Sequence, residues 1–440
     1  MKTKFLAFLL ILPMLAFCDS PITPEQPDGT PDQEQNDTTQ TPEQTDTTQT
    51  PTPDVPEEND ENVITDGACL LATNPNVHKF LTEVTYPDRD YRESKVLDYP
   101  GGYNATRPEN TQVNSDEPPV YYIRWTEDKD AGKLKYEISE TDWKYETELK
   151  AGVSEVAVSN LVPNTHYSYK VSSISTGKVM TEGKFDTYGS LHQVFFKKNV
   201  RNARDLGGWI TYDGKMVKYH KVYRGGRWEA GTLTNSGISG VHAEGLKAQL
   251  DIRGESDVLT KPAIEGMDFC APIIETGGDS MLKAEGGEKV RMCMQFIIDC
   301  VKANKPVYFH CSLGRDRTGT LAMVVLGLLD VIEGDISKEY EVSYFSPKGW
   351  SIAYSETNTI FRNLRTTWAY QPAAMYIWKG EYPNNTYEFV EDVESPEYTR
   401  FSVRMEKYLL DIGISQEDID TFRELMLTEP YPDLTPVSAE

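Results

Sequence analysis

The chain has 440 residues and a formal net charge of −25, a length that suits two or three domains. The acidic total argues against general nucleic-acid binding. The charge is uneven, because residues 19–66 hold fourteen Asp or Glu and no Lys or Arg, whereas residues 194–227 hold nine Lys or Arg against two Asp. Six scattered cysteines do not form a disulfide framework. The six histidines do not cluster at metal-ligand spacings, so we expect no metal and no cofactor.

The first residues have the layout of a secretory signal peptide, assigned to residues 1–17. Two lysines precede an apolar run from Phe5 to Phe17, which is shorter than the roughly twenty residues that a membrane span needs. The run ends in Leu-Ala-Phe-Cys18, which resembles a bacterial lipobox. This resemblance implies cleavage before Cys18 and a lipid anchor to the cell envelope, on the periplasmic side or at the outer surface. An ordinary signal peptide cleaved nearby is the alternative, since a lipobox usually has a small residue where Phe17 stands.

Residues 18–66 consist mainly of Pro, Thr, Gln, Asp and Glu, and Asp-Thr-Thr-Gln-Thr-Pro occurs twice, from 37 and from 46. Such a segment has little apolar surface to bury and cannot offset its ordering entropy. Prolines and like charges keep it extended. We therefore expect a disordered stalk.

Residues 67–189 carry short alternating runs typical of half-buried strands, at 120–125, 135–138 and 153–158. The segment from Leu161 to Tyr167 resembles the Leu-x-Pro-x-Thr-x-Tyr segment of fibronectin type III domains, in which the Tyr hydroxyl pins a corner between strands. The resemblance implies an all-β fibronectin III-like sandwich of about seven strands, ending near Tyr188. Its role is a spacer or packing support for the next domain, or else glycan or protein binding.

One segment carries a chemical pattern. A β-rich run at 307–310 precedes Cys-Ser-Leu-Gly-Arg-Asp-Arg-Thr-Gly at 311–319, and an apolar stretch at 320–331 is long enough for a buried helix. A chain that turns from strand into helix points its backbone N–H groups at a spot ahead of the helix N-terminus, which suits a phosphate dianion. The same potential favours the thiolate form of Cys311 and makes it a nucleophile. Arg317 closes the cradle with its planar fork.

This loop resembles that of the cysteine-dependent protein tyrosine phosphatases. More narrowly, it is similar to the bacterial tyrosine phosphatase family whose loop reads His-Cys-x-x-Gly-Lys-Asp-Arg-Thr-Gly, with Arg315 in place of Lys. Four further segments match in the family's order, at 202–208, 222–226, 250–255 and 413–419. The resemblance runs from Val194 to Leu427. It implies an α/β catalytic domain at 190–430, with a central sheet flanked by helices.

By this resemblance Cys311 attacks phosphorus and forms a cysteinyl-phosphate, Arg317 and the loop amides stabilise the phosphoryl oxygens, and Thr318 hydrogen-bonds the departing thiolate. Water then releases phosphate without a metal. The remaining residues predicted to bind phosphate are Ser312, Leu313, Gly314 and Arg315.

The general acid is less clearly marked, because the chain has no Trp-Pro-Asp segment. The resemblance places it just past the apolar run at 271–274, at Glu275 with Asp279 as its neighbour. Asp316, inside the loop, is the other candidate.

Other residues have both a structural and a functional interpretation. Arg204 and Asp205 either form an internal ion pair that braces the loop or touch substrate, and Arg253 and Glu255 are structural at a strand end. The cysteines expected in the core are Cys270, Cys293 and Cys300. An aromatic run with Trp368, Tyr370, Tyr376 and Trp378 forms core or lines the mouth of the pocket.

The expected substrates are phosphotyrosine in proteins, or phosphoinositides and inositol phosphates, with the basic segment 194–227 favouring polyanions if it folds near the loop. No obligate protein partner is evident. Two alternatives are a surface binding protein with a vestigial phosphatase domain, and a sulfur-handling enzyme of the rhodanese kind.

Overall fold

The computed structural model describes residues 62–86, 99, 116–196, 200–229, 233–346, 370–392 and 394–435. The predicted signal peptide, Cys18 and most of the predicted stalk fall in residues 1–61, outside the described residues. In the described ranges, none of the helices combines the length and the apolar character that crossing a bilayer requires. Residues from Asn59 onward group into a single unit, which is the subject of the description below.

The first region of this unit is built from strands that enclose one core. They are β1 (Ala68–Leu71), β2 (Tyr121–Arg124), β3 (Leu134–Ser139), β4 (Lys144–Leu149), β5 (Glu155–Val158), β6 (His166–Ser173) and β7 (Val179–Tyr188). One sheet has the order β1-β7-β6-β3-β4 and is antiparallel except between β1 and β7, and β2 pairs with β5 in a second sheet. Alternate residues of β3 are buried and share a core with Ile123 of β2. The strands predicted at 120–125, 135–138 and 153–158 are confirmed.

The corner at Tyr167 has a specific hydrogen bond. The Tyr167 hydroxyl accepts a hydrogen bond from the backbone N–H of Val162 at 2.9 Å, and the side chain is 2% exposed. The Thr187 hydroxyl donates to the carbonyl of the same Val162 at 2.6 Å. Both polar groups of Val162 are therefore paired inside the fold, as buried backbone groups require.

The stretch 67–189 is not all-β, contrary to prediction, because it includes helix α1 (Pro75–Glu83). Asn74 caps this helix by accepting from the N–H of Asn76, and Pro75 occupies the first turn, where its missing N–H costs nothing. The buried side chains of α1 recur at helical spacing and join the core of the second region rather than that of the strands. They are Val77, Phe80 and Leu81. The two regions therefore share a packed helix.

The second region has a sheet of order β12-β11-β13-β10-β8, parallel throughout except at β8. Its strands are β8 (Arg204–Asp205), β10 (Val222–Gly225), β11 (Ala248–Asp251), β12 (Asp268–Cys270) and β13 (Val307–His310), and a separate pair joins β9 (Met216–Val217) to β14 (Leu427–Thr428). The helices are α2 (Asn235–Ala243), α3 (Asp279–Leu282), α4 (Ala284–Lys302), α5 (Asp316–Leu328), α6 (Glu333–Glu341), α8 (Tyr370–Lys379), α9 (Phe401–Asp411) and α10 (Gln416–Met426), with the 3-10 turn η4 (Val342–Phe345).

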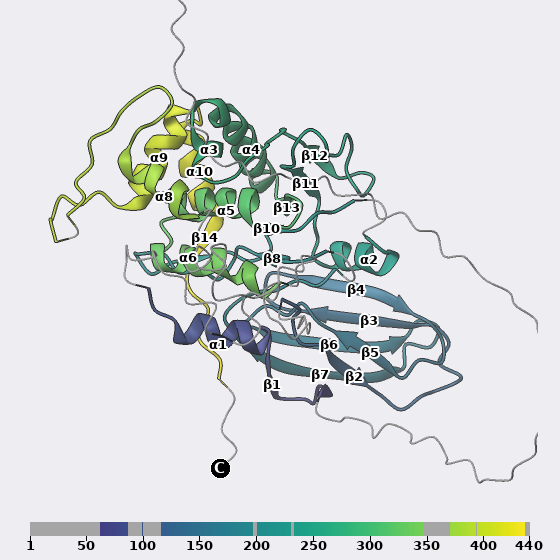
Figure 1. The fold of residues 1–440 in the computed structure, drawn as a ribbon. Coiled ribbons are helices and arrows are strands. Elements are labelled where there is room, and N and C mark those ends of the chain that lie inside the picture. Colours follow the sequence, from purple (N-terminus) through teal and green to yellow (C-terminus); the bar gives the residue numbers. More distant parts are fainter. Residues whose placement is uncertain are drawn as a thin grey trace, which may run out of the picture. The chain divides into compact units, whose positions relative to one another are not determined.

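The alternation of strand residues assigns the two faces of this sheet. In β13, Val307 and Phe309 pack with α4 and α5, whereas Tyr308 packs with Val241 of α2 on the opposite face. Helices α3, α4, α5 and α8 to α10 gather on one side, and α2 lies apart from them, next to β4 (Figure 1). Helix α5 is buried along nearly its whole length, as its apolar sequence predicts. The predicted α/β architecture is confirmed.

Candidate active site

The loop 311–315 runs from the end of β13 to the start of α5. The carbonyl groups of residues 311–314 each face a partner outside the loop. That of Cys311 faces Nδ1 of His310 at 3.2 Å, and that of Ser312 accepts from the N–H of Arg227 at 3.2 Å. The Gly314 carbonyl accepts from Nδ2 of Asn202 at 2.8 Å and from the guanidinium of Arg224. In a trans peptide group the carbonyl of one residue and the N–H of the next point in opposite directions. The N–H groups of the loop therefore point toward its centre.

These inward N–H groups make an anion cradle. The N–H groups of Ser312, Leu313, Gly314 and Arg315 have no hydrogen-bond acceptor among the described residues. Unpaired donors at the start of a helix are a ready site for phosphate. Gly314 is required here for two reasons, because its φ is +71° and a Cβ would lie 2.3 Å from the carbonyl carbon of Gly225.

A buried ionic network braces the loop on the α6 side of the sheet. Arg224 donates to both carboxylate oxygens of Glu339, at 3.1 and 2.9 Å, and Arg204 donates to Glu339 at 2.7 Å. All three side chains are at most 1% exposed. Burial and the neighbouring Arg224 lower the pKa of Arg204 to about 10, so Arg204 stays charged at neutral pH. Arg204 therefore braces the loop, as predicted, but its ionic partner is Glu339 and not Asp205.

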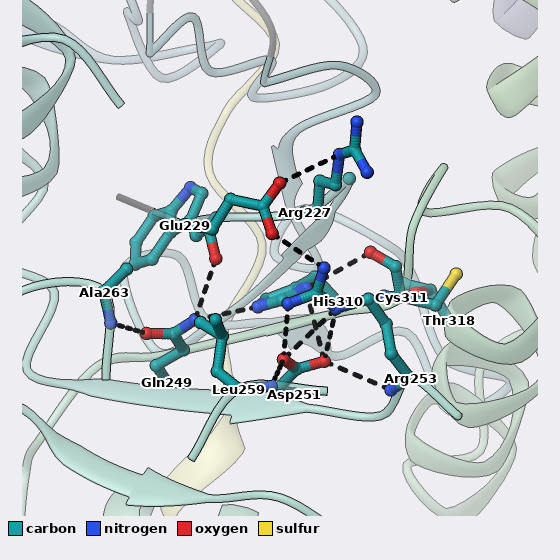
Figure 2. A network of polar contacts seen from close by, with 12 residues as sticks. Arg227, Glu229, Gln249, Asp251, Arg253, Leu259, Ala263, His310, Cys311 and Thr318 are labelled. Carbon is teal, nitrogen blue, oxygen red and sulfur yellow. Dashed lines mark hydrogen bonds and ion pairs between the residues drawn. The ribbon is translucent and has the colours of Figure 1, made fainter. Parts of the chain in front are cut away.

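A second polar network, which includes Gln249, Asp251 and Arg253, contacts His310 at the end of β13 (Figure 2). The Gln249 side-chain oxygen accepts from the N–H of Ala263 at 2.7 Å, which fixes its amide nitrogen as a donor toward Nε2 of His310 at 2.9 Å. Nδ1 of His310 therefore carries the proton and donates a hydrogen bond to the Cys311 carbonyl. Burial lowers the pKa of His310 to about 4, so the ring is neutral at physiological pH. Arg253 pairs with Asp251 in the same network, at 2.8 Å, which confirms its structural role.

The predicted nucleophile Cys311 opens the loop, and the predicted site residues Arg317 and Thr318 lie in the first turn of α5. Cys311 is 4% exposed at the head of the cradle. The Thr318 hydroxyl accepts from the Cys311 N–H at 2.8 Å, and a hydroxyl that accepts in this way still has its own hydrogen to donate. The Arg317 guanidinium donates to the Ile274 carbonyl at 2.8 Å. The segment after Ile274 therefore lies against the start of α5.

The three candidate acids all have partners. Asp316 is bound by both fork nitrogens of Arg315, at 3.0 and 3.2 Å, and by the hydroxyl of Tyr340 at 3.2 Å. The exposed Glu275 accepts from the N–H of Glu255 at 2.8 Å. Asp279 pairs with Lys283 at 2.8 Å. The Asp316 carboxylate is therefore held in an ion pair with Arg315.

Two of the cations in the basic segment 194–227 are used inside the protein. Arg204 and Arg224 are buried in the brace, whereas the Arg227 side chain is 47% exposed and its backbone touches the loop at Ser312. The side chain of Arg315, predicted to bind phosphate, is 13% exposed and engaged with Asp316. The predicted attraction of polyanions therefore depends on fewer cations than the sequence suggests.

The other cysteines contrast with Cys311. Cys293 and Cys300 are buried in α4, and burial raises the pKa of Cys300 to about 12, so both are inert core residues as predicted. Cys270 is half-buried against the same core. Tyr376 and Trp378 also belong to this core, which supports the structural interpretation of the aromatic run, while Trp368 lies outside the described residues.

Sequence reasoning missed two supports of the loop, Glu339 and Gln249. Neither belongs to a local pattern that distinguishes it from a surface residue. It also missed a contact between histidines, since His192 and His220 have ring centroids 5.3 Å apart. Ligand atoms of these two residues and of Glu244 all lie within 4.8 Å of one another, so the prediction that the histidines do not cluster is wrong here.

The Cys-x5-Arg segment is thus set between a parallel strand and a buried helix, and the amides of residues 312–315 have no acceptor among the described residues. A family model described as "Tyrosine phosphatase family" matches residues 197–428, more than half of the chain. The chain belongs to this family.

Two individual proteins that match this chain are similar to it over about a third of its length. A Cupriavidus necator protein named as a candidate tyrosine-protein phosphatase is 27% identical over 164 residues, which cover 32% of this chain and 59% of that protein. A solved structure, the core catalytic domain of a PP-IP phosphatase from S. cerevisiae with citrate, is 18% identical and covers 34% of this chain and 90% of its own, with a TM-score of 0.22.

Proposed function

We propose that the chain is a cysteine-dependent phosphatase that hydrolyses phosphate monoesters. The observation that carries this proposal is the cradle of four N–H groups that have no acceptor in the described part of the chain. They belong to Ser312, Leu313, Gly314 and Arg315, around the head of α5 next to Cys311. Three equatorial oxygens of a transferring phosphoryl group require several donors fixed before the reaction begins. The outward carbonyl bonds and the buried brace supply that rigidity.

In the first step the Cys311 thiolate forms an S–P bond as the P–O bond to the leaving group breaks, and the leaving oxygen takes a proton from a general acid. In the second step water attacks phosphorus, the S–P bond breaks, and inorganic phosphate leaves. The Thr318 hydroxyl, held 2.8 Å from the Cys311 N–H, stabilises the thiolate that reappears. Arg317 exchanges its bond to the Ile274 carbonyl for two phosphoryl oxygens.

Replacement of the nucleophile tests the reaction. Cys311→Ser removes the thiolate and is expected to lower turnover of an aryl phosphate by about 10⁴-fold or more, while vanadate still binds the intact cradle. Cys69→Ser, at a free half-buried cysteine of β1, is the matched control and keeps full activity. Undiminished phosphate release by Cys311→Ser, or no turnover of any aryl phosphate by the wild type, contradicts the proposal.

For the proton donor we propose Glu275, because its only hydrogen-bond partner described here is a backbone N–H, whereas Asp316 is held by Arg315. Glu275→Gln is expected to slow hydrolysis of alkyl phosphates by about 10²-fold and that of p-nitrophenyl phosphate much less, since nitrophenolate leaves without a proton. Asp316→Asn is the paired variant. If Asp316→Asn slows alkyl phosphate hydrolysis more than nitrophenyl phosphate hydrolysis, and Glu275→Gln does not, the general acid is Asp316 instead.

For the substrate we propose phosphotyrosine in proteins, or phosphoinositides and inositol phosphates. Support comes from the exposed Arg227 beside the loop, and from Arg201, whose carbonyl accepts from the N–H of Gly226 at 2.8 Å next to it. Phosphate release from a panel of a phosphotyrosyl peptide, phosphoinositide vesicles and phytate ranks these substrates.

For the remainder of the chain we propose export and a lipid anchor at Cys18, with a fibronectin III-like sandwich that supports the catalytic domain. Packing support is favoured over ligand binding by contacts between the two regions. The Trp143 indole N–H donates to the Ala243 carbonyl at 2.8 Å, and the side chain of Asn160 accepts from the N–H of Phe195 at 2.9 Å. Radiolabelled palmitate incorporation that is lost in Cys18→Ala tests the anchor.

A further inference from the structure

The two histidines noted above lie where the sandwich meets the catalytic sheet. His192 follows the last sandwich strand, His220 precedes β10, and Glu244 follows α2. The side chains of His192, His220 and Glu244 are 0%, 11% and 3% exposed. The loop that carries Cys311 takes no part in this cluster, so the proposed phosphatase reaction gives no role to these residues.

The three residues converge on one point. Oε2 of Glu244 lies 3.7 Å from Nε2 of His192 and 3.8 Å from Nδ1 of His220. The Tyr223 hydroxyl sits between two of them, 3.0 Å from Oε2 of Glu244 and 2.8 Å from Nδ1 of His220. Ligands around a tetrahedral zinc ion with bonds of about 2.0 Å are about 3.3 Å apart, so the two pairs that include Oε2 of Glu244 need to close by only about half an ångström. Ligand atoms of all three residues lie within 4.8 Å of one another.

The opposite nitrogen of each ring faces a further carboxylate. Nδ1 of His192 lies 3.3 Å from Oδ2 of Asp205, and Nε2 of His220 lies 3.4 Å from Oε1 of Glu140. Nε2 of His220 is buried and has no hydrogen-bond partner among the residues that the structure describes, because its geometry toward Glu140 falls short of a bond. A carboxylate behind a ligating imidazole is the usual outer shell of a metal site, where it fixes the tautomer and raises the basicity of the ring.

The charge of the cluster also favours a cation. Asp205, Glu140 and Glu244 are at most 3% exposed at their side chains, and the ion pairs described for them are all with the two histidines. Three buried carboxylates are costly without compensating positive charge. Two imidazole nitrogens and one carboxylate oxygen form a donor set that suits a first-row transition ion better than Mg²⁺ or Ca²⁺.

We propose that Nε2 of His192, Nδ1 of His220 and Oε2 of Glu244 bind a divalent transition metal ion of the zinc class, with Asp205 and Glu140 as the outer carboxylates. In the absence of metal, Nε2 of His192 donates to the Asn160 carbonyl at 3.0 Å, so binding of the ion replaces this hydrogen bond and releases the proton. Because Glu140 comes from the sandwich and the other residues from the catalytic side, the ion joins the two regions.

The test uses the full chain with Cys311→Ser, so that the loop thiolate cannot bind metal. The chelator-treated protein is titrated with Zn²⁺ alone, and separately with Co²⁺, whose visible absorption reports a four- or five-coordinate N/O site. We expect one equivalent to bind, and binding to weaken at least about 100-fold in both His220→Ala and Glu244→Gln. His166→Ala, which alters an exposed His–Asp pair of the sandwich, is the matched control and retains the site.

X-ray absorption of the zinc-loaded protein keeps the test decisive if a variant fails to fold. We expect nitrogen and oxygen scatterers near about 2.0 Å, with the imidazole signature and no sulfur. Absence of saturable binding, a sulfur-containing or imidazole-free shell, or full binding in both His220→Ala and Glu244→Gln overturns the proposal.

Discussion

The two faces of the β8–β10 strand pair carry opposite kinds of buried charge. Arg204 and Arg224 are register partners and project toward Glu339, where two cations share one carboxylate beside the loop. Asp205 and Tyr223 are the next register pair and project the other way, toward two histidines and further carboxylates. The face with Arg204 and Arg224 has more buried cations than carboxylates next to the anion cradle. The face with Asp205 has several buried carboxylates.

This difference shows how one short strand pair serves two sites. Successive side chains of a strand point to opposite faces, so Arg-Asp in β8 and Tyr-Arg in β10 separate the two charge types without any additional structure. The loop face stabilises the Gly314 carbonyl through Arg224. The opposite face ties the catalytic sheet to the sandwich through Asn160 and Trp143.

Removal of Glu339 is expected to have the largest effect on the loop face. Glu339→Ala leaves two buried guanidinium groups without their carboxylate, which costs about 3–5 kcal/mol of unfolding free energy, and it loosens the carbonyl bonds that orient the cradle. Urea unfolding and aryl phosphatase assays measure the two effects. Glu406→Ala breaks a half-exposed pair with Arg423 and is the control, with an expected cost below about 1 kcal/mol. Equal costs for the two variants contradict the brace.

The histidine behind the loop predicts a pH dependence. The pKa of His310 is about 4 in the folded chain, against about 6.5 when unfolded. The unfolded chain therefore binds the proton first, and stability is lost as the pH falls from about 6.5 to about 4, by roughly 3 kcal/mol. Urea unfolding of the wild type and of His310→Asn across this range measures the difference. Parallel pH profiles for the two proteins would show that His310 is not the group responsible.

The smallest expected effects come from two buried tyrosine hydroxyls. Each donates to a carboxylate on a different face of the strand pair, so the two variants compare the faces directly. Tyr223→Phe breaks the bond to Glu244 and is expected to lower stability by about 1–2 kcal/mol with kcat/KM within about twofold. Tyr340→Phe breaks the bond to Asp316 inside the loop, and we expect a similar stability cost with a larger loss of kcat/KM. A fall in kcat/KM for Tyr223→Phe as large as that for Tyr340→Phe would mean that the two faces are coupled.

The order of strands and helices around the loop was predictable because its signals are local. The run 307–310, the loop 311–319 and the apolar stretch after it are contiguous, and each forms the element that its pattern indicates. The corner bond of Tyr167 to Val162 spans five residues and was predictable for the same reason. Helix α1 was missed even though it has a cap and a helical apolar spacing, because its surroundings were interpreted as strands throughout.

The sequence alone determined the cysteine loop, the family and the alternation of strands, since each depends on residues that are neighbours in the chain. Only the tertiary structure decided what the charged residues do. Arg204 and Glu339 are 135 positions apart, and Glu140 and Glu244 reach His220 from different regions. Burial removes water as a partner for each of these charges, and the partner that replaces it is set by the packing of distant elements, which no local pattern records.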